Sequence, residues 1–252
     1  MKKEIEEWWD ETSESYQKSS TISTRSAHYG PYSPDESTLN LLGKVKGKRI
    51  LEIGCGGGQC SIAFAKQGAI CTAMDLSHQQ LEYAKKLAQK NKVDINFFQG
   101  NFQNLNKIKS SSMDIVFSAY ALQYSPDLSI VFKQVYRVLK KNGILAFSFD
   151  HPFFAIINPT NHKIVDSYYN TGKHVITQTW VDKSVHPFVY YRVKMSDIFN
   201  ALQKANFLVE RIIEPMTFKN QTAWTKGRWK NNYPKKMVEL LGPTIIFKAR
   251  KV

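Results

Sequence analysis

A glycine-rich segment near residue 55 combines residue types that could bind a ligand. Residues 50–53 form an apolar run interrupted by Glu52, and four glycines and a cysteine follow it: Gly54, Cys55, Gly56, Gly57 and Gly58. Residues 59–68 then carry apolar side chains at helical spacing. This order predicts a strand, a tight turn and a helix. Glycine lets a ligand touch backbone N–H groups, and the helix turns its partial positive end toward that ligand.

A second acidic residue follows at the spacing of a nucleotide site. Residues 69–75 are typical of a strand that ends on Asp75, 21 residues beyond Gly54. In a βαβ unit the second strand ends beside the glycine turn, so an acid at this interval can reach ribose hydroxyls. Ser77 then starts a predicted capped helix whose first turn contains Gln80. The combination indicates a nucleotide-type cofactor.

The glycine pattern separates two classes of cofactor. The dinucleotide fingerprint requires a glycine where this chain has Gln59, which argues against a nicotinamide or flavin cofactor. An acidic residue two positions before Gly54, followed by G-C-G-G-G, resembles the first motif of the class I S-adenosylmethionine-dependent methyltransferases. The resemblance implies S-adenosyl-L-methionine as cofactor and S-adenosyl-L-homocysteine as product. It also implies an α/β fold with a doubly wound, seven-stranded, mostly parallel sheet of six parallel strands and one antiparallel strand.

The resemblance also implies cofactor contacts at matching positions. Glu52 would take the methionine ammonium, the glycine loop would supply backbone contacts, and Asp75 would hold the ribose diol. Leu76 and Phe102 would enclose adenine, and Asn101, which stands where the family usually has aspartate, would accept from its amino group. The remaining candidates for cofactor contact are Tyr16 and Tyr29 in an N-terminal roof, Gln80 on the capped helix, and Ser118, Tyr120 and Gln123 around the end of the fourth strand.

Candidate catalytic residues lie at the ends of the predicted fourth and fifth strands. The fifth strand, residues 144–149, leads to His151 at the carboxyl edge of the sheet, where open α/β folds bind ligands. Imidazole titrates near neutral pH, so His151 is a candidate base, although it could equally pack or hydrogen-bond at the strand end. Tyr120 and Tyr124 are further candidates. The sequence contains no Pro-Cys pair of the kind that cytosine C5 methyltransferases use, and no metal site is expected from its three cysteines.

The length of 252 residues suits one domain with insertions. The chain is expected to begin with an N-terminal cap over residues 1–47, followed by a cofactor-binding core over 48–150. An insertion at 151–193 is expected to cover the substrate pocket. Residues 194–252 are expected to complete the sheet and to contain a basic aromatic insertion at 214–242. The cap is expected to hold a helix over 4–18 and a second one from Ser33 to Gly43. Further elements expected are strands at 93–98, 113–118, 207–213 and 244–249, helices at 126–141 and 196–205, and a hairpin around 175–181.

The net charge of +14 suggests an anionic partner, and the segment 224–236 alternates aromatic and basic side chains. RNA is therefore one candidate acceptor, while a small molecule held under the predicted insertion is the favoured one. A binding protein without turnover is a third reading. The apolar runs are too short for a membrane span, so a cytoplasmic protein is expected, and the sequence indicates nothing about its oligomeric state.

Overall fold

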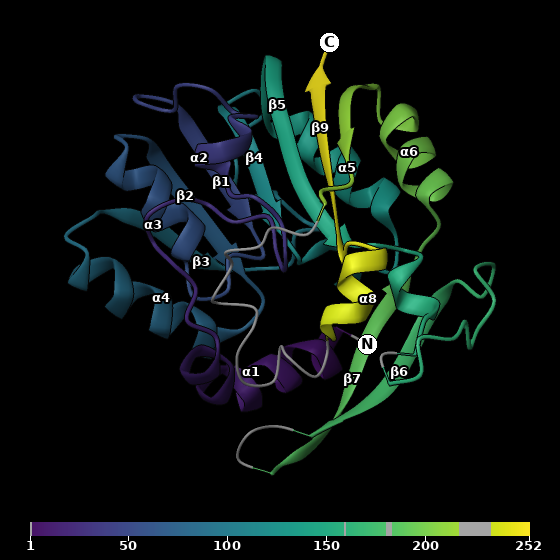
Figure 1. Cartoon of the computed structure of the whole chain (residues 1–252). Coiled ribbons are helices and arrows are strands. Elements are labelled where there is room, and N and C mark those ends of the chain that lie inside the picture. The colour runs from purple at the N-terminus through teal and green to yellow at the C-terminus, as the bar shows by residue number, and fades with distance from the viewer. Residues whose placement is uncertain (1, 159, 180–182, 217–232) are drawn as a thin grey trace.

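The computed structural model describes residues 2–158, 160–179, 183–216 and 233–252. Its centre is a seven-stranded sheet in the order β3-β2-β1-β4-β5-β9-β8 (Figure 1). Strand β9 runs antiparallel to both of its neighbours and the others run parallel, which confirms the predicted doubly wound sheet. The strands are β1 (Arg49–Ile53), β2 (Ile70–Asp75), β3 (Ile95–Gln99), β4 (Met113–Ala119), β5 (Leu139–Asp150), β8 (Phe207–Ile213) and β9 (Thr244–Lys251).

Helices cover both faces of the sheet (Figure 1). On one face α3 and α4 bury apolar side chains such as Phe64 and Leu81 against the strands. On the other face α5 and α6 do the same with Val135 and Ile198. Each helix therefore places its apolar stripe on the sheet, as the spacing of its apolar residues requires. The bounds are α3 (Gln59–Lys66), α4 (His78–Lys90), α5 (Leu128–Val138) and α6 (Met195–Lys204).

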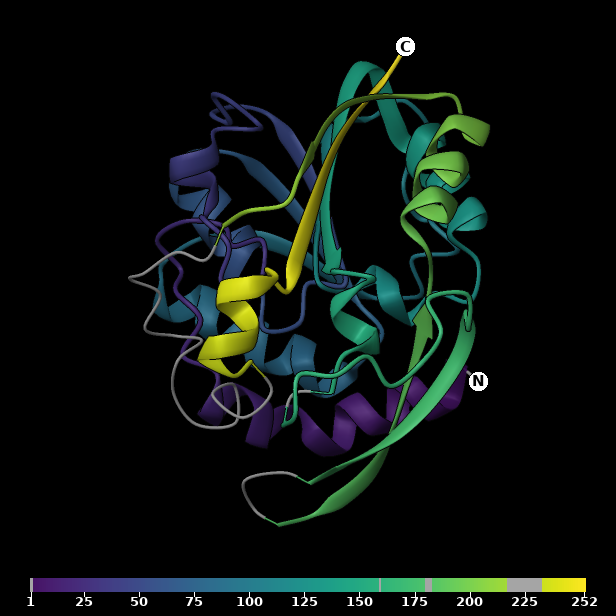
Figure 2. The ribbon, with the colours of Figure 1, turned by 45° about the vertical axis from the view of Figure 1, so that its right-hand side comes forward.

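A long N-terminal helix, α1 (Lys2–Ser19), lies across the carboxyl ends of the parallel strands (Figures 1 and 2). The Ser77 hydroxyl, just after β2, donates a 2.6 Å hydrogen bond to Asp10 of this helix. The side-chain amide of Gln99, at the end of β3, donates to Glu6 at 3.0 Å. These bonds hold α1 over the edge of the sheet at which ligands bind in open α/β folds.

A hairpin of β6 (Gly172–Thr179) and β7 (Val185–Arg192) extends from the core and crosses α1 (Figure 2). Two polar contacts join them: Lys173 Nζ lies 3.4 Å from Glu4 and forms an ion pair with it, and His186 Nδ1 lies 2.9 Å from Glu11. The structure thus contains the expected hairpin, although Val181 lies outside the described residues. The hairpin and α1 together form a roof beside the sheet edge.

The second predicted helix is much shorter than expected. It comprises only α2 (Glu36–Leu39), and its cap is Asp35, whose side chain accepts from the Thr38 N–H, rather than Ser33. The helix ends at Asn40, which adopts a left-handed conformation with φ 47°. The Glu36 carboxylate then accepts from the backbone N–H of Leu42 at 2.7 Å, which stabilises a turn in place of further helix.

The helix expected over 126–141 also ends early, at Val138. Leu139 already pairs with Met113 in the sheet, so β5 starts two residues before the predicted helix end. The short elements that complete the fold are η1 (Leu122–Tyr124), η2 (Phe154–Ile156) and α8 (Lys235–Leu240). None of the helices in the described part of the chain has the length and apolar composition needed to cross a membrane.

Candidate active site

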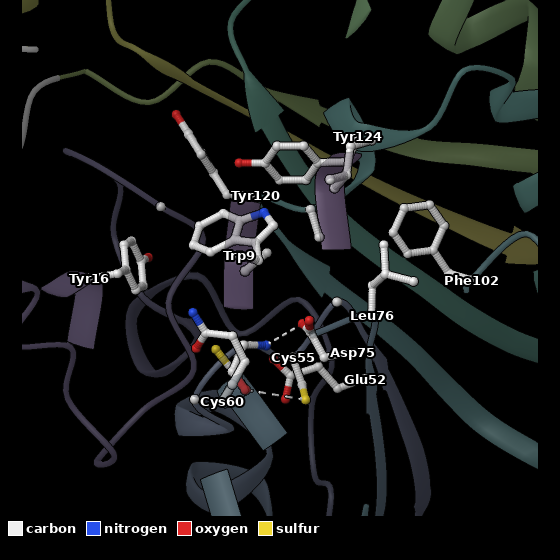
Figure 3. A pocket seen from close by; sticks show the side chains of 18 of the residues that line it. Trp9, Tyr16, Glu52, Cys55, Cys60, Asp75, Leu76, Phe102, Tyr120 and Tyr124 are labelled. Atoms are coloured by element: carbon white, nitrogen blue, oxygen red, sulfur yellow. Dashed lines mark hydrogen bonds between the residues drawn. The ribbon is translucent and has the colours of Figure 1, made fainter. Parts of the chain in front are cut away.

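A pocket opens between the carboxyl ends of the strands and the roof made by α1 and the hairpin (Figure 3). Its wall includes the glycine loop, the ends of β2 and β4, the segment after β3, and side chains from α1 and β7. The predicted site residues that the pocket brings together are Tyr16, Glu52, Gly54, Cys55, Gly56, Asp75, Leu76, Gln80, Asn101, Phe102, Tyr120 and Tyr124. The pocket therefore joins positions from widely separated parts of the sequence.

Two glycines allow the chain to pack closely around this pocket. Gly54 has φ +68°, and a Cβ there would lie 2.2 Å from the Cβ of Ala121, just after β4. Gly30 has φ +115°, and a Cβ there would lie 2.2 Å from the ring of Tyr120. Both positions need glycine for its backbone conformation and for the space that a side chain would fill. The floor of the pocket depends on this close approach.

Glu52 is a buried carboxylate in the polar half of the pocket. It is 2% exposed and accepts hydrogen bonds from both the backbone N–H of Ser61, at 2.8 Å, and the Ser61 hydroxyl. Burial raises the pKa of Glu52 to about 7, the bonds from Ser61 oppose this shift, and the nearby Asp75 carboxylate adds to it. A cationic group bound beside Glu52 would favour the ionised carboxylate, as the methionine ammonium would.

Asp75 lies at the end of β2 beside the glycine loop, as its spacing predicted. Its Oδ2 accepts from the Gly56 N–H at 2.7 Å, and its Oδ1 accepts from the Ser77 N–H at 2.9 Å. Burial raises the pKa of this carboxyl group. Each carboxylate oxygen has more than one lone pair, so Asp75 can hold the loop and still accept from a ribose hydroxyl.

Three glutamines connect α1 to the pocket floor. Gln59 Nε2 donates to Gln17 Oε1, and Gln17 Nε2 donates to Gln80 Oε1, each at 2.8 Å. Gln80 is 1% exposed, and its Nε2 meets no hydrogen-bonding partner among the described residues. A buried donor without a partner is costly, and a bound ligand with an acceptor atom would satisfy it. Together with the glycine loop and the two carboxylates, this donor fits S-adenosyl-L-methionine.

The half of the pocket under the roof is aromatic. The Trp9 ring lies between those of Tyr16 and Tyr124, with centroid distances of 5.2 and 5.7 Å and nearly perpendicular planes (Figure 3). Tyr120 and Tyr191 complete this part of the wall. These edge-to-face contacts join the rings into one aromatic wall, the aromatic box, along this half of the pocket.

Four predicted cofactor contacts lie outside the pocket lining and require correction. Tyr29 is fully buried, and its hydroxyl donates to Glu36 at 2.6 Å, so it supports the core instead of roofing the cofactor. Gly58 caps α3, and a Cβ there would crowd α4. The Ser118 hydroxyl donates to the Ile53 carbonyl at 2.9 Å, and the Gln123 amide donates to the Tyr120 carbonyl at 2.8 Å. The last two side chains hold neighbouring backbone in place.

The expectation that His151 faces a substrate is also corrected. The side chain is 2% exposed and does not line the pocket. Its Nε2 lies 2.8 Å from Glu214 Oε1, and its Nδ1 accepts from the Phe153 N–H at 3.2 Å. Both ring nitrogens are thus used within the fold, which matches the packing role that the sequence left open.

Tyr120 lines the pocket through its ring, while its hydroxyl is engaged elsewhere. The hydroxyl donates to the Pro243 carbonyl at 2.7 Å and lies 2.9 Å from the Thr244 hydroxyl. Burial raises the pKa of Tyr120 well above its ordinary value, with the Asp150 carboxylate contributing in the same direction. Tyr120 therefore stays protonated at neutral pH and is unsuited to act as a base.

Sequence reasoning did not single out several residues of the pocket. Trp9 lies in the helix expected over 4–18, and Tyr191 lies in the segment expected as an insertion at 151–193. Gln59 and Cys60 follow the glycine loop and also line the pocket. The spacing of Trp9 and Tyr16 on one helical face was the available signal, whereas nothing local marks Tyr191.

Comparisons with known proteins relate the chain to methyltransferases. Residues 51–147 match the family described as "Methyltransferase domain". An uncharacterized protein of Haemophilus influenzae is 28% identical over 85% of each chain. A ubiquinone biosynthesis O-methyltransferase of Coxiella burnetii is 36% identical, but the match covers 41% of this chain and 44% of that protein. Among solved structures, an S-adenosylmethionine-dependent methyltransferase from Mesorhizobium loti superposes with a TM-score of 0.66 at 23% identity, covering 85% of this chain and 95% of that one.

Proposed function

Because residues 51–147 match the methyltransferase domain and the fold agrees, we propose that the chain is a class I S-adenosylmethionine-dependent methyltransferase, and that it methylates a small molecule held in the aromatic half of the pocket. The cofactor supplies an electrophilic methyl group, which passes to an O, N or C atom of the acceptor while sulfur keeps the bonding electron pair. The contribution of the protein is to hold the two reactants in line, an effect that can be worth several kcal/mol.

The polar half of the pocket is the place for the cofactor. Glu52 takes the methionine ammonium, the loop at Gly54 and Gly56 approaches the ligand closely, and Asp75 accepts from the ribose hydroxyls. Leu76 and Phe102 both line the pocket, and adenine would lie between them, with Asn101 next to Phe102 in the chain (Figure 3). The unpartnered amide nitrogen of Gln80 supplies a further donor.

A small acceptor is supported by the way α1 and the hairpin cover the pocket. Trp9 and Tyr16 of α1 form part of the lining together with Tyr191 of the hairpin, so the acceptor half is covered by side chains from both roof elements. A roofed aromatic box suits a compact, largely apolar molecule. The Coxiella relative is named for a reaction in ubiquinone biosynthesis, which is also consistent with a small acceptor. The basic aromatic segment that favours RNA falls largely on residues 217–232, outside the described part of the chain.

The decisive experiment combines purified protein and radiolabelled S-adenosyl-L-methionine with separate metabolite and RNA fractions. We expect label in small molecules, and little RNA labelling or binding at physiological salt. If RNA were the acceptor, its affinity would fall with salt by a slope near −0.7 per phosphate contact and its labelling would be structure-selective. Asp75→Ala serves as the binding-deficient control. Cofactor binding without label in either fraction would favour a non-catalytic protein and overturn the proposal.

A further inference from the structure

The hydroxyl of Tyr191 is buried without serving the fold. The side chain is 7% exposed, and its oxygen meets no hydrogen-bonding partner among the described residues. An unpaired buried hydroxyl lowers stability, because it has lost its bonds to water without replacing them. The side chain is nevertheless part of the pocket lining.

Two roof elements hold Tyr191 in this place. It pairs with Lys173 across the hairpin and packs with Ile5 of α1 and Val189 of β7. Trp9 and Tyr124 of the aromatic box pack against the same cluster. The Tyr191 side chain is therefore held in the wall of the pocket by residues from three separate segments.

The charges around the pocket restrict what can bind there. Within the described part of the chain, the lining contains no Lys or Arg, although the net charge of the protein is +14. Its acidic groups are Glu52 and Asp75, and burial lowers the pKa of His28, the histidine in the lining, to about 4, so this ring is neutral at pH 7. Among the described lining residues, a phosphate or carboxylate would meet no cationic side chain. A cationic acceptor would meet the sulfonium of the cofactor in the same enclosed space.

We propose that Tyr191 orients the acceptor by a hydrogen bond, and that the acceptor is an uncharged, planar ring compound carrying a hydroxyl, carbonyl or neutral amine. This inference rests on the proposed function, because it assigns the aromatic half of the pocket to the acceptor. The flat faces of Trp9 and its neighbours stack on the ring, and Tyr191 fixes its rotation. The hairpin, which lies outside the cofactor-binding core, thereby determines acceptor specificity.

The test uses protein saturated with S-adenosyl-L-homocysteine and three matched pairs of probes: phenol and 4-hydroxybenzoate, catechol and 3,4-dihydroxybenzoate, and 2-naphthol and 3-hydroxy-2-naphthoate. Calorimetry should show at least one uncharged member binding about tenfold more tightly than its carboxylate. Tyr191→Phe should weaken that binding about tenfold and leave the affinity for S-adenosyl-L-homocysteine within twofold. No binding by any uncharged probe, equal or tighter binding of the carboxylates, or unchanged binding by Tyr191→Phe would overturn the inference.

Thermal unfolding supplies an independent readout. Tyr191→Phe should melt at or above the wild-type temperature, because it removes an unpaired hydroxyl and keeps the ring. The control Tyr29→Phe loses a 2.6 Å bond to Glu36 and should melt lower. A lower melting temperature for Tyr191→Phe would show that its hydroxyl stabilises the fold and would refute the proposal. Failure of the wild type to bind S-adenosyl-L-homocysteine would refute the proposed function itself. This result is distinct from the outcomes above, which refute only the role of Tyr191.

Discussion

The buried carboxyl of Glu52 should make both stability and cofactor affinity depend on pH. Burial raises the pKa of Glu52 from 4.5 to about 7 in the folded protein. Between these values the folded chain keeps a proton that the unfolded chain releases. The stabilisation that the protonated Glu52 gives the folded state is fully present below pH 4.5 and is lost as the pH rises through 7. The difference in pKa corresponds to about 3 kcal/mol of the free energy of unfolding.

The substitution Glu52→Gln removes this titration and keeps the side-chain shape. We expect the free energy of unfolding of the wild type, measured with urea from pH 5 to 8.5, to fall relative to that of Glu52→Gln by roughly 2 to 3 kcal/mol. The exposed carboxylate of Glu82, which pairs with Lys85, provides the control Glu82→Gln. This control should follow the wild-type pH dependence.

Cofactor binding should depend on pH in the opposite direction. If the methionine ammonium pairs with ionised Glu52, binding below pH 7 must release the Glu52 proton, and affinity should weaken by up to about tenfold for each pH unit below 7. Calorimetry in buffers of different ionisation enthalpy would measure that proton release. The same pH dependence of stability and binding in Glu52→Gln and in the wild type would refute the reasoning.

Three further substitutions test the pocket and its surroundings. Asp75→Asn should weaken S-adenosyl-L-homocysteine binding by about 1.5 to 3 kcal/mol in calorimetry, the range for hydrogen bonds to a charged group, and unchanged affinity would place the ribose elsewhere. Gly54→Ala should lower the urea midpoint of unfolding much more than Gly43→Ala does. The two glycines have similar φ values, +68° and +66°, but only Gly54 lacks room for a Cβ. Equal losses of stability in the two variants would contradict this steric explanation. His151→Ala should lower the melting temperature and leave the inflections of the pH–rate profile in place, whereas a lost inflection near neutrality would restore His151 as a base.

The cofactor half was predictable because its residues follow local rules of spacing. Gly54 and Asp75 each lie at the end of a strand, and parallel strands bring their carboxyl ends to one edge. The same reasoning could not separate Tyr16 from Tyr29, since both are tyrosines of the N-terminal segment. Their difference arises from tertiary packing: Tyr29 points its hydroxyl at Glu36, whereas Tyr16 meets the pocket.

The acceptor half was not predictable, because its residues meet only after long-range packing. The whole cofactor-binding core lies between Trp9 and Tyr191 in the sequence, and no local pattern relates a helix to a strand of an inserted hairpin. His151 was misplaced for a related reason. The end of β5 is at the correct edge of the sheet, but the contacts with Glu214 and Phe153 turn the ring into the fold. Position at a strand end thus does not determine where a side chain points.

The two attachments of α1 differ in chemistry. The glutamine chain through Gln17 joins the helix to the pocket floor by uncharged amides, whose bonds salt does not screen. The hairpin meets the same helix through Glu4 and Glu11, with Lys173 and His186 as partners, and such half-exposed ion pairs weaken as ionic strength rises. Raising the ionic strength will therefore weaken the charged contact between the hairpin and α1, while the packing of Ile5 against Val189 and Tyr191 keeps the two elements together.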